Sequence, residues 1–326
     1  MRRIALAFLV LAAVAVPVSA QNPNPGCATA STPTQDACEK AADLFNYMMP
    51  QLGTSLVGGS HTLGVGTTLG GFPHFAIALR GNAIMGDLPD ISGLNVSTGG
   101  RSSSNIATNS QILGLPGVDF AVGIYKGFPL GVTRVGGVDL IGSVTYVPTI
   151  EDTDGGVSIE TDGGSTKIGL GARVGLLEQS LVVPGVSFSY LVRDIPTINL
   201  TASASDADFA INQFTIKTKS WRLAAQKNLM IFQLGLGIGQ DTYTSGADLS
   251  IVVNDPIPSA ATVNTQLDQE LKRTTMYGSL GFNLLVAKIV AEVGQVSGGD
   301  VNTYNTFDEA ADKSRLYGSV GIRISF

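Results

Sequence analysis

The chain ends on a stretch in which apolar and polar positions alternate: Tyr317-Gly-Ser-Val-Gly-Ile-Arg-Ile-Ser-Phe326, preceded by Arg315 and Leu316. Apart from Gly318, one set of alternating positions is entirely apolar: Leu316, Val320, Ile322, Ile324 and Phe326. The other set carries the polar and charged side chains: Arg315, Tyr317, Ser319, Arg323 and Ser325. A period of two indicates a β-strand. A face without charge suits lipid, because a Lys or Arg at mid-membrane costs about 2–4 kcal/mol in a barrel wall.

The same period of two recurs through most of the chain from residue 73 onward. It is clearest in seven segments: 74–85, 118–125, 138–146, 167–174, 186–193, 232–241 and 275–284. Residues 211–223 and 287–296 follow it less regularly, and we predict a β-bulge near 217–223 that shifts the pattern. Each segment is about ten residues long, which is the length that a tilted strand needs to cross the hydrocarbon layer.

The connections between these segments alternate in length. Short connections are predicted at 69–72, 126–135, 176–183, 225–229 and 285–287, and long polar ones at 86–115, 147–164, 194–210, 244–270 and 298–313. This alternation is typical of transmembrane barrels, which have short periplasmic turns and longer outer loops. We therefore predict an all-β fold, an antiparallel transmembrane β-barrel of 10–14 strands. Twelve is the preferred count, if 59–68 and part of 197–210 pair. A soluble antiparallel sandwich is the alternative.

The charged residues of these strands fall on the face opposite the apolar one. The predicted lumen-facing charged residues are Arg80, Asp119, Asp139, Lys167, Arg173, Arg193, Asp241, Lys288, Glu292, Arg315 and Arg323. Seven are positive and four negative, so a mildly cationic lumen is expected inside a chain of net charge −6. The pattern predicts either a channel for anionic or amphipathic solutes or ion pairs that close a small barrel.

The first twenty residues have the features of a secretory signal peptide. Arg2 and Arg3 precede an apolar run over 4–16, and Val18-Ser19-Ala20 offers a small-residue cleavage site. The run is shorter than the ~20 residues that a membrane-spanning helix needs. We therefore divide the chain into a signal peptide (1–20), an N-terminal segment (21–58) and a barrel (59–326).

The N-terminal segment is predicted to be helical and tethered by a disulfide. Cys27 and Cys38 are the only cysteines, and in an exported protein they are expected to pair. Asp36 and Glu39 have the spacing of a helix N-cap and its capping box. The apolar face that follows comprises Ala41, Leu44, Phe45, Met48 and Leu52, and Pro50 is expected to end or kink the helix. The segment is predicted to be a plug or a periplasmic element.

Composition excludes several classes of function. The acidic balance and the scattered lysines and arginines argue against a nucleic-acid partner. His61 and His74 are the only histidines. Both are predicted to lie near the N-terminal periplasmic rim, and neither has an acid at a suggestive spacing. We therefore predict that the protein is not an enzyme, with no catalytic, cofactor-binding or metal-binding residue; a barrel hydrolase is a disfavoured alternative.

The final ten residues resemble the C-terminal signal of bacterial outer-membrane barrels. In that family the last strand ends on an aromatic residue and is read by the barrel-assembly machinery. The resemblance assigns this role to Tyr317, Ile322, Ile324 and Phe326. It implies location in a bacterial outer membrane, with membrane lipid and the assembly machinery as partners.

A looser resemblance concerns the N-terminal segment. A helical, disulfide-bearing segment before a barrel of this size is similar to the fatty-acid transporter FadL and related barrels. In that family an N-terminal hatch fills the lumen, and hydrophobic substrates pass the barrel wall. The resemblance carries over no individual binding residue. The expected function is passive transport of small hydrophobic or amphipathic molecules. The alternative is a structural or adhesive barrel whose loops 86–115 and 244–270 contact outside partners.

Overall fold

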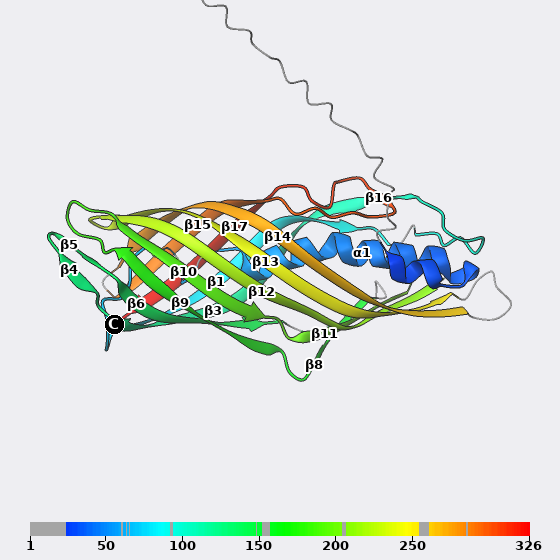
Figure 1. Cartoon of the computed structure of the whole chain (residues 1–326), viewed down its shortest axis with the longest axis horizontal. Helices are drawn as coiled ribbons and strands as arrows, with labels where there is room; N and C mark the ends of the chain where they lie inside the picture. The colour runs from blue at the N-terminus through cyan, green and yellow to red at the C-terminus, as the bar shows by residue number, and fades with distance from the viewer. Residues whose placement is uncertain are drawn as a thin grey trace, which may run out of the picture.

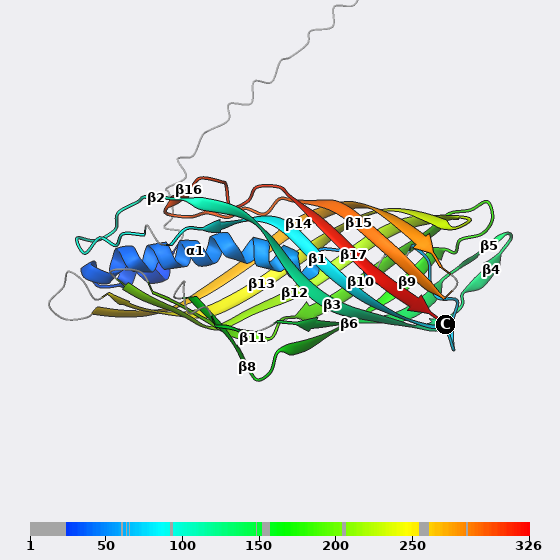
Figure 2. The same cartoon turned by 180° about the vertical axis from the view of Figure 1, so that it is seen from behind.

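The computed structural model describes residues 24–59, 61–62, 64, 66–91, 94–147, 149–151, 157–203, 207–253, 261–284 and 286–326. The predicted signal peptide lies outside the described residues. Within them, no helix combines the length and the apolarity needed to cross a bilayer. The structure instead consists of one long helix and a large antiparallel sheet (Figures 1 and 2).

Ten strands of this sheet form a closed ring. The order is β10-β9-β6-β3-β1-β17-β15-β14-β13-β12, and antiparallel pairing of β10 with β12 closes it. Their bounds are β1 Phe75–Pro89, β3 Thr108–Tyr125, β6 Gly137–Tyr146, β9 Thr166–Leu177, β10 Gly185–Asp194, β12 Ala207–Leu229, β13 Phe232–Val253, β14 Ala261–Asn283, β15 Ala287–Ser297 and β17 Arg315–Ser325. Closure satisfies the backbone groups that an open edge would leave unpaired in lipid.

Ten strands lie within the predicted range, but the preferred count of twelve was too high. The described residues of 59–68 form no strand. They lie inside the ring, where the inner wall hydrogen-bonds them. Residues 197–203 do form a strand, but it pairs with β12 outside the ring.

The terminal strand is held by β1, which brings the two ends of the barrel domain together. Ala76 lies opposite Ser325, and the backbones of Phe75 and Phe326 exchange two hydrogen bonds of 3.0 and 2.9 Å. The rings of these two residues stack at 5.0 Å between centroids. This end of the barrel, which we call the turn end, also carries the short connections 126–136, 178–184, 230–231 and 284–286. The opposite end is the loop end.

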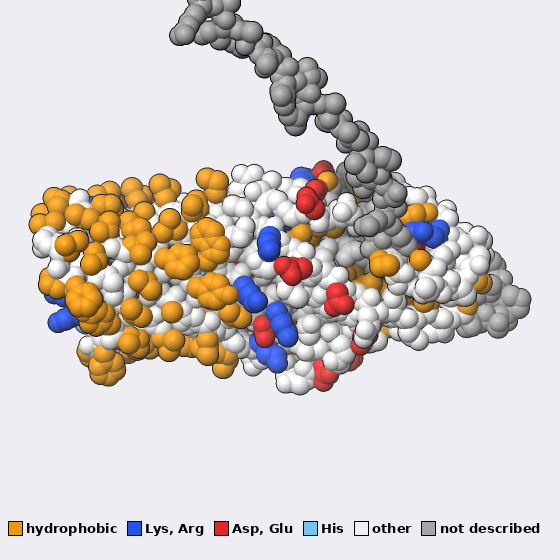
Figure 3. All heavy atoms as spheres, in the orientation of Figure 1, with side chains coloured by type: hydrophobic (Ala, Val, Ile, Leu, Met, Phe, Trp, Pro, Cys, Tyr) orange, Lys and Arg blue, Asp and Glu red, His pale blue; other side chains and the backbone are white. Residues whose placement is uncertain are grey.

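A belt of apolar side chains surrounds the turn-end half of the barrel (Figure 3). Leu236, near the turn end of β13, keeps 71% of its surface exposed. Other exposed apolar residues of the belt are Leu79, Leu170, Leu280, Val320 and Ile322. A continuous apolar surface of this kind is unfavourable in water and matches the lipid-facing band of a transmembrane barrel. In outer-membrane barrels, the end with the longer loops faces outward from the cell.

Strands β12, β13 and β14 continue well past this belt. We call their loop-end parts, residues 207–218, 241–253 and 261–273, the outer wall. Along β13 the even-numbered residues point outward throughout. They are apolar in the belt, at Phe232, Leu234, Leu236 and Ile238, and mostly polar beyond it, at Thr242, Thr244, Asp248 and Ser250. The odd-numbered residues show the opposite change, with buried Tyr243, Leu249 and Ile251 following Gln233 and Asp241. The apolar face therefore changes sides with no break in the strand.

This reversal explains an error in the predicted connections. The segment 244–270 was expected to be a long polar loop, but most of it belongs to β13 and β14, which pair from Phe232–Phe282 to Val253–Ala261. The pattern continues with its polarity exchanged between the two faces. The turn expected at 225–229 lies instead at Met230 and Ile231.

The predicted bulge exists, but it lies nearer the loop end. The register between β12 and β13 shifts between Asn212 and Thr215, where Gln213 has a φ of 52°. The extra residue changes the parity of the inner face. Phe209 on one side of the bulge and Phe214 on the other therefore both point inward. Beyond the bulge the inner parity continues without interruption to Gln226.

Helix α1 (Thr32–Val57) packs against the inner side of the outer wall (Figures 1 and 2). Phe45 meets Phe214 edge to face at 5.7 Å between ring centroids. Gly53 lies flat against the ring of Tyr243, where a Cβ atom would sit only 2.7 Å from Cδ1. This close approach explains a glycine in a helix interior, where it otherwise costs about 1 kcal/mol.

Shorter elements complete the two ends. Strands β11 (Thr197–Ser203), β8 (Val157–Asp162) and β7 (Ile150–Glu151) extend the sheet beside β12. Strand β2 (Asn105–Ile106) pairs in parallel with β16 (Thr306–Phe307), which joins the connections 90–107 and 298–314 over the helix. At the turn end, β4 (Phe128–Leu130) and β5 (Thr133–Val135) form a small hairpin.

Candidate functional site

The N-terminal segment lies at the loop end of the barrel and inside it. A 3-10 helix, η1 (Pro25–Thr29), precedes α1, and Cys27 is bonded to Cys38 as predicted. Helix α1 begins earlier than expected, after Ser31, and continues through Pro50 to Val57. Of the two effects expected of Pro50, an end of the helix was wrong. Because proline has no N–H, the carbonyl of Asn46 one turn earlier lacks its helical donor, and the Gln269 side-chain amide donates to it at 3.5 Å.

Asp36 is not the helix N-cap but a buried anchor for an outer connection. Its carboxylate accepts hydrogen bonds from the backbone N–H groups of Ser97 and Ser102 at 2.8 and 2.9 Å, and pairs with Lys40 at 2.5 Å. Two turns further on, Asp43 accepts the backbone N–H groups of Tyr304 and Asn305 at 3.0 and 2.6 Å. Burial raises the pKa of Asp43, although these hydrogen bonds oppose the shift. The two carboxylates hold both loop-end connections against the helix.

After α1, the described residues of 58–74 form a plug inside the barrel. The two ring nitrogens of His61 lie 2.8 Å from Ser189 Oγ and 2.9 Å from Ser220 Oγ. The Gly66 N–H donates to Gln226 at 2.7 Å, and the Leu69 N–H donates to Asp139 at 3.1 Å. The described plug residues therefore bond to side chains from several strands, and they fill the turn-end half of the lumen.

Buried ion pairs line the wall around this plug. The three pairs are Arg80–Asp119 at 2.8 Å, Arg173–Asp139 at 2.6 Å and Arg222–Asp241 at 2.8 Å. Arg173 also donates to the Thr62 hydroxyl at 2.8 Å, so Arg173 and Asp139 both hold the plug. These pairs are of the kind that the ion-pair alternative predicted.

The remaining predicted lumen charges occupy different environments. Arg315 binds Asp87 at 2.5 Å, and Glu292 accepts the Tyr317 hydroxyl at 2.9 Å. Arg193 and Arg323 are buried on the inner face, and Lys288 is half-buried and bonds to Gln233. Lys167 was predicted to face the lumen, but it is exposed at the loop end of β9 because the wall ends there. Among the described residues, no hydrogen-bond partner faces the Arg193 guanidinium.

Three inner charges were missed by the sequence analysis. Arg222 lies on β12 within 217–223, the stretch where a bulge was predicted, so its inward position was not recognised. Arg273 lies in the part of β14 that was predicted to be loop, and Asp87 lies in the predicted loop 86–115. In 214–226 the even-numbered residues face inward, and applying this pattern to the sequence would have identified Arg222.

His61 was expected near the periplasmic rim but is buried inside the lumen. Both of its ring nitrogens face serine hydroxyls, and neither bonds to a carboxylate. Asp241 reaches Ser220, at 2.5 Å, and not the imidazole. A catalytic triad instead places the imidazole between the nucleophile and the acid. The arrangement is therefore that of a packed polar interior.

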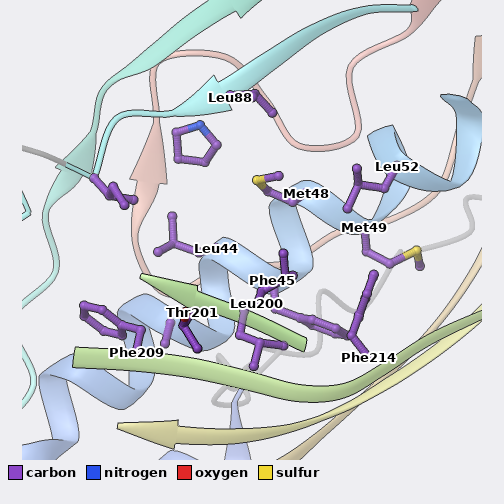
Figure 4. Close-up of a pocket in the computed structure, with 14 residues that line it drawn as sticks. Leu44, Phe45, Met48, Met49, Leu52, Leu88, Leu200, Thr201, Phe209 and Phe214 are labelled. Atoms are coloured by element: carbon purple, nitrogen blue, oxygen red, sulfur yellow. The ribbon is translucent and has the colours of Figure 1, made fainter. Parts of the chain in front are cut away.

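An apolar pocket of about 270 Å³ lies beside α1 at the loop end (Figure 4). The helix contributes the face that the sequence predicted, including Leu44, Phe45, Met48 and Leu52. β11 and β12 contribute Leu200, Thr201, Phe209 and Phe214, and the end of β1 contributes Leu88 and Pro89. Among the described lining residues, Thr201 alone has a polar side chain.

The pocket lies on the side of the barrel where the strands are short and the wall does not extend past the belt. Its two walls, the end of β1 and the β11–β12 pair, are separated in the ring by β3 and by the short strands β6, β9 and β10. Leu44, Met48 and Leu52 remain only half-buried there. A bound apolar molecule would cover them, gaining about 25 cal/mol for each Å² removed from water. The volume is nearly twice that of a ~150 Å³ protein cavity that binds benzene.

Comparisons with known proteins identify no family for this chain. No protein-family model and no curated protein matches the sequence. The beta domain of the Bordetella autotransporter BrkA is similar at 10% identity over 77% of this chain and 99% of that one, with a TM-score of 0.33. The transport unit of the autotransporter AIDA-I from Escherichia coli has 9% identity, 88% and 99% coverage, and a TM-score of 0.35. A Pseudomonas aeruginosa FadL homologue has 9% identity, 78% and 90% coverage, and a TM-score of 0.23.

Replacing Asp139 by Asn tests whether the contacts of Asp139 and Arg173 hold the plug against the wall. The change leaves the Arg173 guanidinium buried without its counter-ion, which typically costs about 3–5 kcal/mol. We expect that loss in the free energy of unfolding, measured by urea titration in lipid vesicles, and a rise in single-channel conductance as the plug loosens. Asp268→Asn, an exposed change on β14, is the matched control and should alter neither. Unchanged conductance would show that these contacts do not close the lumen.

Proposed function

We propose that this protein is a bacterial outer-membrane barrel that takes up small hydrophobic or amphipathic molecules, and that the pocket beside α1 is their first binding site. The observation that supports this most is an apolar pocket on the plug helix itself, at the loop end of the barrel, which in this proposal faces outward. A molecule bound there would touch the element that leads directly into the closed lumen.

The proposed location follows from the surface of the barrel. Its belt requires lipid as a partner, and closed β-barrels that span membranes are typical of outer membranes. The end of β17 presents Ile322, Ile324 and Phe326 outward, while Tyr317 points inward. These exposed residues are available to the assembly machinery before the strand meets β1.

The proposed transport is passive and needs the plug to move. In the described structure residues 58–74 bond to the wall at successive positions, so solute has no straight route through the lumen. Ligand in the pocket would contact Met48, Met49 and Leu52, within about two turns of the point where α1 ends and the plug begins. Binding at this position is therefore suited to shift the helix and, with it, the plug.

Filling the pocket with a larger side chain should weaken the binding of an apolar probe. Leu44→Trp places an indole ring in the cavity, and we expect at least a tenfold weaker saturable binding of N-phenyl-1-naphthylamine to the protein in lipid nanodiscs. The measurement is the fluorescence rise that this probe shows in an apolar site. Leu236→Trp adds the same side chain on the lipid belt and should leave saturable binding unchanged. Heat-dependent gel mobility checks that each variant is folded. Equal binding by both variants would contradict the assignment of the pocket.

Locking the plug should stop uptake but spare binding. A Cβ atom at Gly137 would lie 3.4 Å from Thr68 Cβ, close to the ~3.5–4.5 Å found in disulfides. We expect the Thr68→Cys, Gly137→Cys double variant to bind the probe but not to admit it to vesicles until a reductant is added. The two single variants, treated in the same way, control for reduction of Cys27–Cys38. Full uptake through the oxidised double variant would show that the plug need not move.

The alternative, an adhesive or structural barrel, draws on the outer wall. Its outward face is largely polar and well formed, with Asp248, Gln266 and Asp268 exposed to water. A folded protein that neither binds the probe nor admits it would favour this alternative.

A further inference from the structure

Strand β12 carries outward-facing lysines at both ends of the lipid belt, and their surroundings differ. At the turn end, the Lys227 ammonium donates to the carbonyls of Ser180, Leu181 and Val183, at 2.9, 2.7 and 3.4 Å. The protein itself therefore satisfies this charge at the membrane edge.

At the other edge of the belt, two lysines lack such partners. Lys219 and Lys217 occupy successive outward positions just beyond Trp221, roughly 7 Å apart along the strand. Both are exposed, and within the part of the chain that the structure describes neither makes an ion pair or hydrogen bond. Trp221 marks the interface, because indole rings are enriched where the hydrocarbon layer meets the headgroups.

A third lysine extends this group across the sheet. Lys219 lies opposite Thr242 of β13, and Thr242 lies opposite Lys272 of β14. Two strand spacings separate the two lysines, roughly 10 Å, and their side chains point to the same outer face. Figure 3 shows Lys and Arg side chains next to the loop-end border of the apolar belt. We call Lys217, Lys219 and Lys272 the lysine row.

Two carboxylates lie next to the row without neutralising its centre. Glu270 is 3.8 Å from Lys272, with both side chains more than 60% exposed. Asp194 lies opposite Lys217 on β10. The nearest positions to Lys219 are Val192 and Thr242 across the strands, and Trp221 and Lys217 along its own. Screening in water weakens the exposed pairs, so the row remains able to attract anions.

We propose that the lysine row binds the phosphate groups of an anionic lipid in the outer leaflet. The belt places the row at headgroup depth, because its last apolar residues on β13 and β14, Ile238 and Met276, lie two outward positions below Thr242 and Lys272. A flexible ammonium on a long stem reaches phosphate as a point charge. Lys227, already satisfied by protein carbonyls, needs no such ligand. The proposal is independent of uptake through the pocket.

The test compares lipid retention by two sets of variants. Lys217→Gln, Lys219→Gln and Lys272→Gln are combined in one protein, and Lys126→Gln, an exposed lysine of the turn end, is the matched control. Each protein is placed in nanodiscs of zwitterionic phospholipid containing a tenth of a bisphosphorylated glycolipid or of its dephosphorylated form. Native mass spectrometry then counts the glycolipid molecules that remain bound after release from the disc.

Each lysine near an anionic surface contributes roughly fivefold to affinity. We expect the triple variant to retain at least tenfold less phosphorylated glycolipid, the control to match the unmodified protein, and added salt to reduce the difference. The dephosphorylated form should bind all proteins equally weakly. Equal retention of the phosphorylated lipid by the triple variant would overturn the proposal, as would equal retention of the two glycolipid forms by the unmodified protein. Gel mobility and probe binding in the triple variant confirm that it is folded.

Discussion

A β-strand sends successive side chains to opposite faces, and that alternation cannot change along β13 unless a residue is inserted. The environment of the strand does change, from lipid outside and a polar lumen inside to water outside and an apolar helix inside. The sequence of β13 meets both environments by exchanging the chemistry of its two faces near residue 240. The barrel and the structure above it are therefore one continuous sheet, and the outer wall supplies the apolar surface on which α1 folds.

The position of the helix determines that the lumen is closed. Because α1 ends inside the barrel, the glycine-containing segment after it must follow the inner wall to reach Phe75. Its polar backbone groups need partners in a space with little water, and they find them in Gln226, Glu178 and Asp139. The buried guanidinium groups also need partners, and each of Arg80, Arg173 and Arg222 pairs with a carboxylate of the wall itself. The lumen is closed by hydrogen bonds and ion pairs, whereas the pocket at the loop end is lined almost wholly by carbon and sulfur.

Sequence alone predicted the parts of the fold that depend on the lipid belt. The ring strands, the inward position of residues such as Arg80 and Arg173, and the disulfide all follow from alternation and composition. The outer wall was missed because alternation was recognised only where outward residues are apolar, and beyond residue 240 they are polar. Only the helical half of the pocket could be predicted, from the apolar face between Ala41 and Leu52. Phe209 and Phe214 complete the lining because a bulge turns both inward, and the sequence does not fix the position of that bulge. The hydrogen bonds of His61 and Leu69 to the wall join residues 70 or more positions apart, and no local pattern encodes them.

The exchange of faces along β13 can be measured directly with single nitroxide labels on cysteines introduced at positions 234–251, since the native cysteines are paired. In lipid vesicles, collision with oxygen reports lipid contact and collision with a nickel chelate reports water. The account predicts oxygen contact at 234, 236 and 238, nickel contact at 244 and 248, and neither at 243, 249 and 251. Nickel contact at 249 and 251, or oxygen contact at every even position to 250, would contradict it.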